Sequence, residues 1–251
     1  MKLNWRGVVF IVSLVVLWQV VSTIGVFNES LFPSPPKVFS AFLVLVYSGE
    51  LLIDIFSSLW RVLLGLAIGS VIGVVLGLLV GRTLWLDKIA SPTLNILRAL
   101  PPVAIIPLMI VWFGIGDNAK IIEIAFAVFF PVWISTLIGA KSINENYLRT
   151  AKIFVKSKQQ ALRKILFPAT LPFIANGIRI GIAVAFIMVF VSELAGASSG
   201  LGYLIAYAQI IYRADIMFVG LIVLGLLAAA TDQIFIFAYT KKFPWVNKNG
   251  E

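Results

Sequence analysis

The stretch VLLGLAIGSVIGVVLGLLVG, residues 62–81, contains no charged side chain. A helix needs roughly 20 consecutive apolar residues to cross the hydrocarbon core of a bilayer, and this stretch provides that length. The rest of the chain has the same character, since 61% of its 251 residues are hydrophobic and only 12% are charged. The sequence therefore predicts an integral membrane protein of the all-α class.

Further apolar segments on both sides of this stretch predict a polytopic protein with about six transmembrane helices. We expect the spans near residues 7–27, 59–81, 92–113, 119–140, 173–195 and 216–239. The first segment lacks the small-residue cleavage site of a signal peptide and is expected to be a retained helix. Residues 37–56 are expected to form an outer amphipathic stretch after the rigid SLFPSPP turn. We treat residues 1–251 as a single transmembrane domain.

The lysine and arginine residues predict the orientation of the spans, because cytoplasmic loops carry an excess of these residues. With the N-terminus inside, only three basic residues fall on outer segments, namely Lys37, Lys120 and Arg213. The inner segments hold fourteen: Lys2, Arg6, Arg82, Lys88, Lys141, Arg149, Lys152, Lys156, Lys158, Arg163, Lys164, Lys241, Lys242 and Lys248. Both termini and the segment 141–172 are therefore expected to be cytoplasmic.

The composition disfavours several kinds of chemistry. The chain has no cysteine, which excludes disulfides and thiolate metal sites, and no histidine, the commonest general base and metal ligand. It has no GxxxxGK[ST] nucleotide motif and no paired acidic motif within a span. We therefore expect no catalytic residue, no metal site and no enzymatic activity. The net charge of +9 is attributed to the cytoplasmic face rather than to nucleic acid as a partner.

Two glycine-rich segments leave alternatives open. In the second span, glycine recurs at every fourth position, which removes side chains from one face of the helix and lets another backbone approach closely. These residues are Gly65, Gly69, Gly73, Gly77 and Gly81. The row indicates either helix packing within one subunit or a seam between two copies. The stretch GASSGLGYL, residues 196–204, indicates either a re-entrant turn with a gating role or a simple chain reversal.

Charged side chains within spans are costly and are candidates for a function, although pairing or snorkelling explains many of them. Six occur here: Arg61, Arg98, Glu123, Arg179, Glu193 and Asp232. Arg98 precedes Pro101, Pro102 and Pro107, so we expect the third helix to break near it and to free backbone groups that line a cavity. We choose Arg98, Pro102 and Glu193 as candidates for the solute pathway, and we expect a basic side chain there to suit an anion.

The segment 141–164 carries seven basic residues against one acid, Glu145. Its apolar residues recur at roughly helical spacing, and Pro168 and Pro172 are expected to break or kink the helix before the fifth span. Such an amphipathic helix can act as a lever on the span that follows. Alternatively, it lies on anionic lipid head groups.

The segment RTAKIFVKSKQQALRKILFPATLP, residues 149–172, resembles the cytoplasmic signature loop of ABC-importer permeases. That signature reads roughly EAA, three residues, Gly, about nine variable residues and a hydrophobic-x-LP ending. Four other stretches resemble the permeases of nitrate/sulfonate/taurine-type importers: FPSPPKV (32–38), SLWRVLLG (58–65), LRALPPVAIIPLMIVWFGIG (97–116) and SELAGASSGLGYLI (192–205). The resemblance covers about residues 30–240, which we expect to form the permease core.

The signature loop departs from the family pattern. Arg149 stands where the family has Glu, Thr150 and Ala151 occupy the two small positions, and Val155 replaces the Gly. A β-branched residue is unfavourable in a turn with positive φ, so the turn is either reshaped or matched by a changed partner. The family implies that the loop 141–172 couples the permease to an ATPase. The expected coupling residues are Arg149, Thr150, Ala151, Val155, Lys156, Ser157, Leu162, Pro168 and Pro172.

The resemblance also implies a type I ABC-importer permease fold and a set of partners. These are a second permease copy (a homodimer), two ATPase subunits that bind ATP and Mg in place of this chain, an extracytoplasmic solute-binding protein and membrane lipid. It implies a bacterial or archaeal cytoplasmic (inner) membrane and a small solute, with an anion such as nitrate, a sulfonate, taurine or bicarbonate expected. The alternative is a secondary transporter driven by an ion gradient, although we find no inverted internal repeat between residues 1–125 and 126–251.

Overall fold

The computed structural model describes residues 5–24, 28–144 and 157–245, and the regular secondary structure of these residues is entirely helical. Within these ranges, five helices are long and apolar enough to cross a membrane, or six if the bent pair α4–α5 is one span. The long helices are α1 (Trp5–Thr23), α3 (Glu50–Arg82), α6 (Asp117–Ser142), α9 (Phe167–Leu194) and α11 (Ala214–Lys242). The predicted all-α fold with about six spans is confirmed for these residues.

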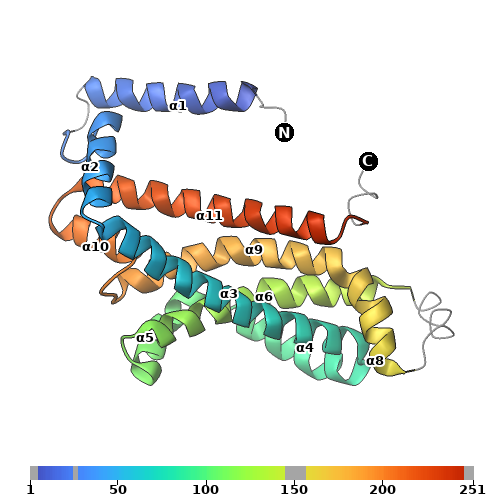
Figure 1. Cartoon of the computed structure of the whole chain (residues 1–251). Coiled ribbons are helices and arrows are strands. Elements are labelled where there is room, and N and C mark those ends of the chain that lie inside the picture. The colour runs from blue at the N-terminus through green and yellow to red at the C-terminus, as the bar shows by residue number, and fades with distance from the viewer. Residues whose placement is uncertain (1–4, 25–27, 145–156, 246–251) are drawn as a thin grey trace.

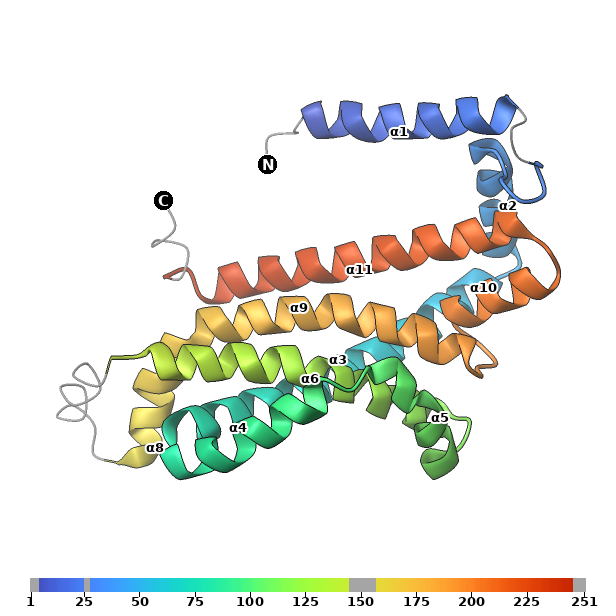
Figure 2. The same cartoon turned by 180° about the vertical axis from the view of Figure 1, so that it is seen from behind.

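The long helices α3, α6, α9 and α11 run side by side (Figure 1). Helix α1 is separate from this bundle and lies on the side of α11 (Figure 1). The short helices α2 (Pro35–Tyr47), α5 (Pro102–Phe113) and α10 (Leu201–Ile210) gather at one end of the bundle. Figure 2 shows α8 (Lys158–Ala161) at the opposite end, where α1 begins and α11 ends. The main core lies between α3, α6 and α9 around Val62, Val128 and Ile182.

The glycine row of α3 faces α6 within the same subunit. A Cβ on Gly69 would lie 2.5 Å from the carbonyl oxygen of Ala125, and one on Gly73 would lie 3.0 Å from backbone atoms of Phe129 and Trp133. The first separation is shorter than real side chains show, and the second is tighter than nearly all real contacts. The same holds at the other three glycines of the row, which lie against Ile124, Thr136 and Ala140. The structure therefore shows intrasubunit helix packing, the first of the two alternatives for this row.

The second spanning helix begins at Glu50, so the prediction of an outer amphipathic stretch over residues 37–56 is wrong for its second half. Helix α2 ends at Tyr47, the chain turns at Gly49 with φ 81°, and residues 50–56 are already the first turns of α3. Asp54, a charged residue in these first turns, is buried and accepts a hydrogen bond of 2.7 Å from the backbone N–H of Gly200. A tertiary contact thus satisfies the acid within the helix.

The predicted span 92–113 is not one straight helix. It is divided between α4 (Leu84–Arg98) and α5, whose axes differ by 93°. The break has a local cause, because a residue that precedes proline is driven out of the helical region. Pro101 precedes Pro102 and is extended, with φ −63° and ψ 121°. The break lies directly after Arg98, where the prolines predicted it.

The fifth spanning helix begins at Phe167, earlier than the predicted residue 173, and Pro168 and Pro172 do not end it. Pro168 lies in the first turn of α9, and Pro172 lies inside the helix. A five-residue π-helix, η1 (Leu162–Leu166), comes immediately before Phe167 and follows α8 without a gap. In both views the α8 segment is turned away from the axis of α9 (Figures 1 and 2). A π-helix and proline are established causes of such bends.

Candidate functional site

The end of the bundle opposite α8 holds a group of polar side chains that we call the Arg61 cluster. Four of them are buried, Asp117 is exposed and Ser199 is half-buried: the cluster consists of Asp54, Ser58, Arg61, Asp117, Glu193 and Ser199. The Nη1 atom of Arg61 lies 2.6 Å from Oε1 of Glu193 and donates at 2.7 Å to the carbonyl oxygen of Ser199. Its Nε atom donates at 2.8 Å to Oδ1 of Asp117. A buried charge is tolerated when it is paired and hydrogen-bonded in this way.

The cluster fixes the turn 195–200 to α3. The backbone N–H groups of Gly200, Leu201 and Gly202 donate to Asp54, Ser58 and Glu193 respectively, at 2.7–2.9 Å. Gly200 has φ 122°, and a Cβ there would collide with the carboxylate of Glu193. The turn therefore requires glycine for both its conformation and its contact.

Glu193, a candidate for the solute pathway, belongs to this cluster. Its side chain is completely buried, and both carboxylate oxygens accept hydrogen bonds from Ser58 Oγ at 2.9 Å. A side chain with no exposed surface cannot contact a passing solute in this conformation. The sequence suggested pairing as the alternative role, but nothing in it identified Arg61, 132 positions away, as the partner.

A second basic side chain, Lys120, holds the same turn from α6. Its Nζ atom donates at 2.9 Å to the carbonyl oxygen of Gly196 and at 3.3 Å to that of Gly116. Lys120 is buried, although we predicted it as an outer basic residue. Glu123, one turn further along α6, is also buried, and its Oε2 atom has no hydrogen-bond partner among the described residues.

The other two pathway candidates lie at the break between α4 and α5. Arg98 is the last residue of α4 and is exposed, and Pro102 is the first residue of α5. In the described ranges Arg98 makes no hydrogen bond or ion pair. Some backbone groups at the break are hydrogen-bonded to one another. The N–H of Leu100 donates to the carbonyl oxygen of Leu97, and the N–H of Ala104 donates to that of Pro101. The structure thus presents a basic side chain next to a broken helix.

Four residues of the predicted coupling loop are described. Ser157 precedes α8, and its Oγ atom accepts a hydrogen bond of 3.2 Å from the backbone N–H of Gln160. Leu162 begins the π-helix, and Pro168 and Pro172 lie in α9. The other predicted coupling residues fall outside the described ranges: Arg149, Thr150, Ala151, Val155 and Lys156.

Next to the coupling segment, α4 and α6 are joined by an ion pair. The Nζ atom of Lys141 lies 2.7 Å from the carboxylate of Asp87, which also accepts a hydrogen bond from Ser91. Arg82, at the end of α3, donates at 3.1 Å to the carbonyl oxygen of Ala140. These contacts hold together the ends of three helices on the α8 side of the bundle.

A further ion pair lies deep in the spans, between Arg179 of α9 and Asp232 of α11. The Nε and Nη2 atoms of Arg179 donate to the two carboxylate oxygens of Asp232 at 3.0 and 3.1 Å. Both residues were counted among the charged residues in spans, for which we expected pairing or snorkelling. Pairing is what the structure shows.

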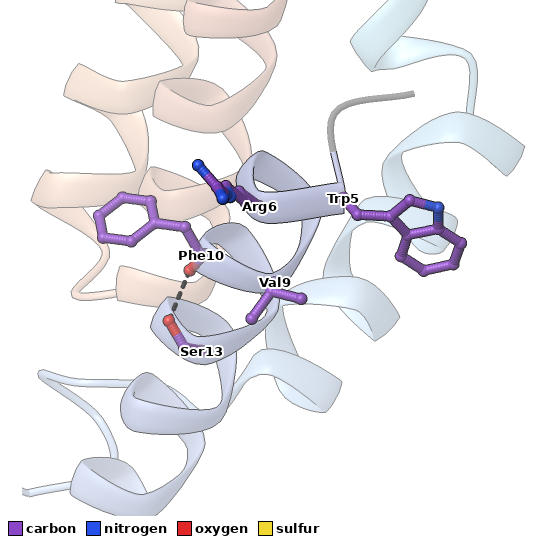
Figure 3. Close-up of a pocket in the computed structure, with 5 residues that line it drawn as sticks. All are labelled: Trp5, Arg6, Val9, Phe10 and Ser13. Atoms are coloured by element: carbon purple, nitrogen blue, oxygen red, sulfur yellow. Dashed lines mark hydrogen bonds between the residues drawn. The ribbon is translucent and has the colours of Figure 1, made fainter. Parts of the chain in front are cut away.

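Two hollows on the described surface are open grooves rather than closed solute sites. The first, of about 430 Å³, is lined by Trp5, Arg6, Val9, Phe10 and Ser13, which all belong to the first turns of α1. Figure 3 shows these side chains spread around one helix, with Ser13 Oγ donating to the carbonyl oxygen of Phe10. The second, of about 340 Å³, is an apolar groove between α3, α9 and α11.

The comparisons with known proteins bear on this arrangement. Residues 69–239 match the family model described as binding-protein-dependent transport system inner membrane component. The chain is 36% identical to the protein named as an aliphatic sulfonates transport permease, SsuC, of Escherichia coli (strain K12), over 88% of this chain and 84% of that protein. It is 31% identical to the taurine transport system permease protein TauC of the same strain, over 92% and 86%.

Among solved structures, the chain is similar to one of the MetNI methionine ABC transporter in an inward-facing conformation. The TM-score is 0.66 at 22% identity, over 80% of this chain and 97% of that chain. This likeness concerns the fold and confirms the predicted ABC-importer permease fold. The alternative of an ion-gradient-driven secondary transporter finds no support. The chain belongs to the family of binding-protein-dependent transport system inner membrane components and is a membrane-spanning permease subunit of an ABC importer.

Proposed function

We propose that this permease imports a small organic sulfonate, such as taurine or an alkanesulfonate, across a bacterial or archaeal cytoplasmic membrane. The observation that carries the proposal is the similarity over most of both chains to relatives named for sulfonates and for taurine. The exposed Arg98 at the break between α4 and α5 supports an anionic solute. Arg98 and Pro102 remain our candidates for the pathway at this break.

The proposed transporter contains two copies of this chain, two ATPase subunits and a solute-binding protein, all embedded in or bound to the lipid membrane. ATP and Mg bind to the ATPase subunits, so this chain is a non-catalytic subunit. We propose no nucleic-acid partner. Both termini lie in the cytoplasm, as the distribution of Lys and Arg predicts.

The ATPase is proposed to bind at residues 141–172. The continuous helical chain from Lys158 through η1 to Leu194 supports this role, because a displacement of α8 acts on α9 without an intervening loop. Arg149 and Val155, which depart from the family pattern, are proposed to contact an ATPase surface matched to them. A family member with Glu and Gly at these positions would then bind this ATPase less tightly.

The test is to purify the chain with its ATPase, reconstitute both with the binding protein in vesicles, and measure taurine uptake and ATP hydrolysis. We expect uptake to require ATP and all three components. Scrambling residues 149–165 should abolish co-purification of the ATPase, whereas scrambling residues 246–250 should not. Uptake by the permease alone under an imposed proton gradient would overturn the proposal.

A further inference from the structure

Arg179 is exposed and Asp232 is half-buried, although both lie near the middle of a spanning helix. Their side chains are 49% and 25% exposed. At a rise of 1.5 Å per residue, Arg179 lies about 18 Å from the Phe167 end of α9, and Asp232 about 15 Å from the Lys242 end of α11. A charge at such a depth is costly against lipid and normally faces a bundle interior or a water-filled cavity.

Two uncharged polar residues extend this surface. Asn176 lies one turn before Arg179 on α9 and is exposed, and Gln233 follows Asp232 on α11 and is also exposed. We call these four residues the α9–α11 polar patch. The surrounding face of α9 adds a small exposed side chain, Ala183, one turn beyond Arg179. The patch therefore places four polar side chains on two membrane-spanning helices, beside the exposed apolar side chains of Ile180 and Ile234.

The exposed surface of α3 provides an internal comparison. At a similar distance from the α8 side of the bundle, two exposed side chains of α3 that do not line the groove between α3, α9 and α11 are branched and apolar: Ile68 and Ile72. That is the composition expected of a surface that faces lipid chains. The α9–α11 polar patch differs from it in four side chains, whose polarity is typical of a surface that faces water or a subunit contact rather than lipid.

The geometry of the ion pair indicates the chemistry of a ligand. Asp232 occupies the Nε and Nη2 atoms of Arg179, while the Nη1 atom donates to none of the described residues. A guanidinium presents its donors in a planar fork that matches the oxygens of a carboxylate or another oxyanion. A sulfonate head group that approaches the patch can bind the free Nη1 donor and compete with Asp232 for the others.

We propose that the α9–α11 polar patch lines the solute pathway and that Arg179 is the residue that binds the oxyanion head group of the sulfonate. Asp232 holds the guanidinium in place when no solute is present, and Asn176 and Gln233 supply neutral hydrogen-bonding groups beside it. This inference rests on the proposed function for the identity of the solute, but the prediction that the patch faces water does not.

The first test is independent of transport. Because the chain has no cysteine, the reactivity of a single introduced cysteine measures how accessible that one position is to water. In the reconstituted complex, Asn176→Cys should react with a charged, water-soluble methanethiosulfonate at least about tenfold faster than Ile72→Cys, and taurine should slow the reaction of Asn176→Cys. Equal slow reaction of both variants would show that the patch faces lipid or a sealed subunit contact, and would overturn the inference.

The second test measures the solute contact. Arg179→Gln should raise the KM for taurine by about tenfold or more, and Arg179→Lys should raise it less. Arg213→Gln is the matched control, because Arg213 forms a similar pair with Asp215 at 2.7 Å but lies outside the span; its KM should not change. An unchanged KM for Arg179→Gln would overturn the inference.

A reversed pair separates binding from a structural role. The double variant Arg179→Asp with Asp232→Arg keeps an ion pair between α9 and α11 and moves the guanidinium to the other helix. If Arg179 binds the solute, the reversed pair folds but does not restore the KM; if the pair only joins the helices, the KM is restored and the inference fails.

Absence of ATP-driven taurine uptake by the unmodified complex would instead refute the proposed function, and the cysteine test would still decide whether the patch faces water.

Discussion

Arg61 on α3 and Glu193 near the end of α9 form an ion pair of 2.6 Å with side-chain exposures of 4% and 0%. Because Glu193 also accepts hydrogen bonds from Ser58 and from the N–H of Gly202, one carboxylate joins two long helices and the turn after α9. The loss of one partner of such a pair is costly, because the other charge stays buried without compensation.

Glu193→Gln should therefore lower the free energy of unfolding by about 3 kcal/mol. The measurement is denaturant unfolding of the purified permease in detergent, followed by tryptophan fluorescence. Glu123→Gln is the control, since Glu123 is equally buried but has a carboxylate oxygen without a partner among the described residues. Its effect should stay below about 1 kcal/mol. Equal losses in the two variants would contradict the special role of the pair.

Gly69→Val should prevent the close approach of α3 and α6, because a Cβ at this position already lies 2.5 Å from the carbonyl oxygen of Ala125. We expect a large loss of correctly folded protein, measured as the monodisperse fraction in size-exclusion chromatography. Gly225→Val provides the control within a spanning helix, since nothing lies within 4 Å of a Cβ there. If both variants are equally tolerated, the packing of α3 on α6 is looser than the structure shows.

Gly200→Ala should destabilise the turn after α9 for two reasons, the positive φ of 122° and the collision of a Cβ with Glu193. Gly114→Ala isolates the first reason, because Gly114 has φ 78° but open space around its Cβ. Backbone strain alone costs on the order of 1–3 kcal/mol. The apparent unfolding temperature should fall further for Gly200→Ala than for Gly114→Ala, and a reversed order would refute the contact with Glu193.

Lys141→Gln should change stability by less than about 1 kcal/mol, because exposed ion pairs contribute little. Lys141 pairs with Asp87 at 2.7 Å between α4 and α6, but its side chain is largely solvent-exposed. The small effect should decrease further in high salt, which screens exposed charges. A large, salt-independent effect on the unfolding temperature would show that the pair is shielded from solvent, for example by another subunit.

The sequence was sufficient for the parts of the fold that depend on local composition. Apolar runs identified the spanning helices, and Pro101 and Pro102 identified the break after Arg98. The sequence did not predict the features that depend on a contact between residues far apart in the chain. Asp54 interrupts an apolar pattern, yet its bond to Gly200, 146 positions away, lets α3 extend through it. Glu193 looked available to a solute for the same reason, since its partner on α3 cannot be read from its neighbours.

The close packing of the glycine row on α6 also limits how this protein can change shape. A sliding motion of α3 along α6 would drive Cβ-bearing residues such as Ile124 and Val128 out of the recesses that Gly65 and Gly69 provide. We therefore expect the two helices to move as one rigid body. An alternation between conformations is then expected to bend the chain outside this body, with the break after Arg98 and the bend between α8 and α9 as the candidate positions.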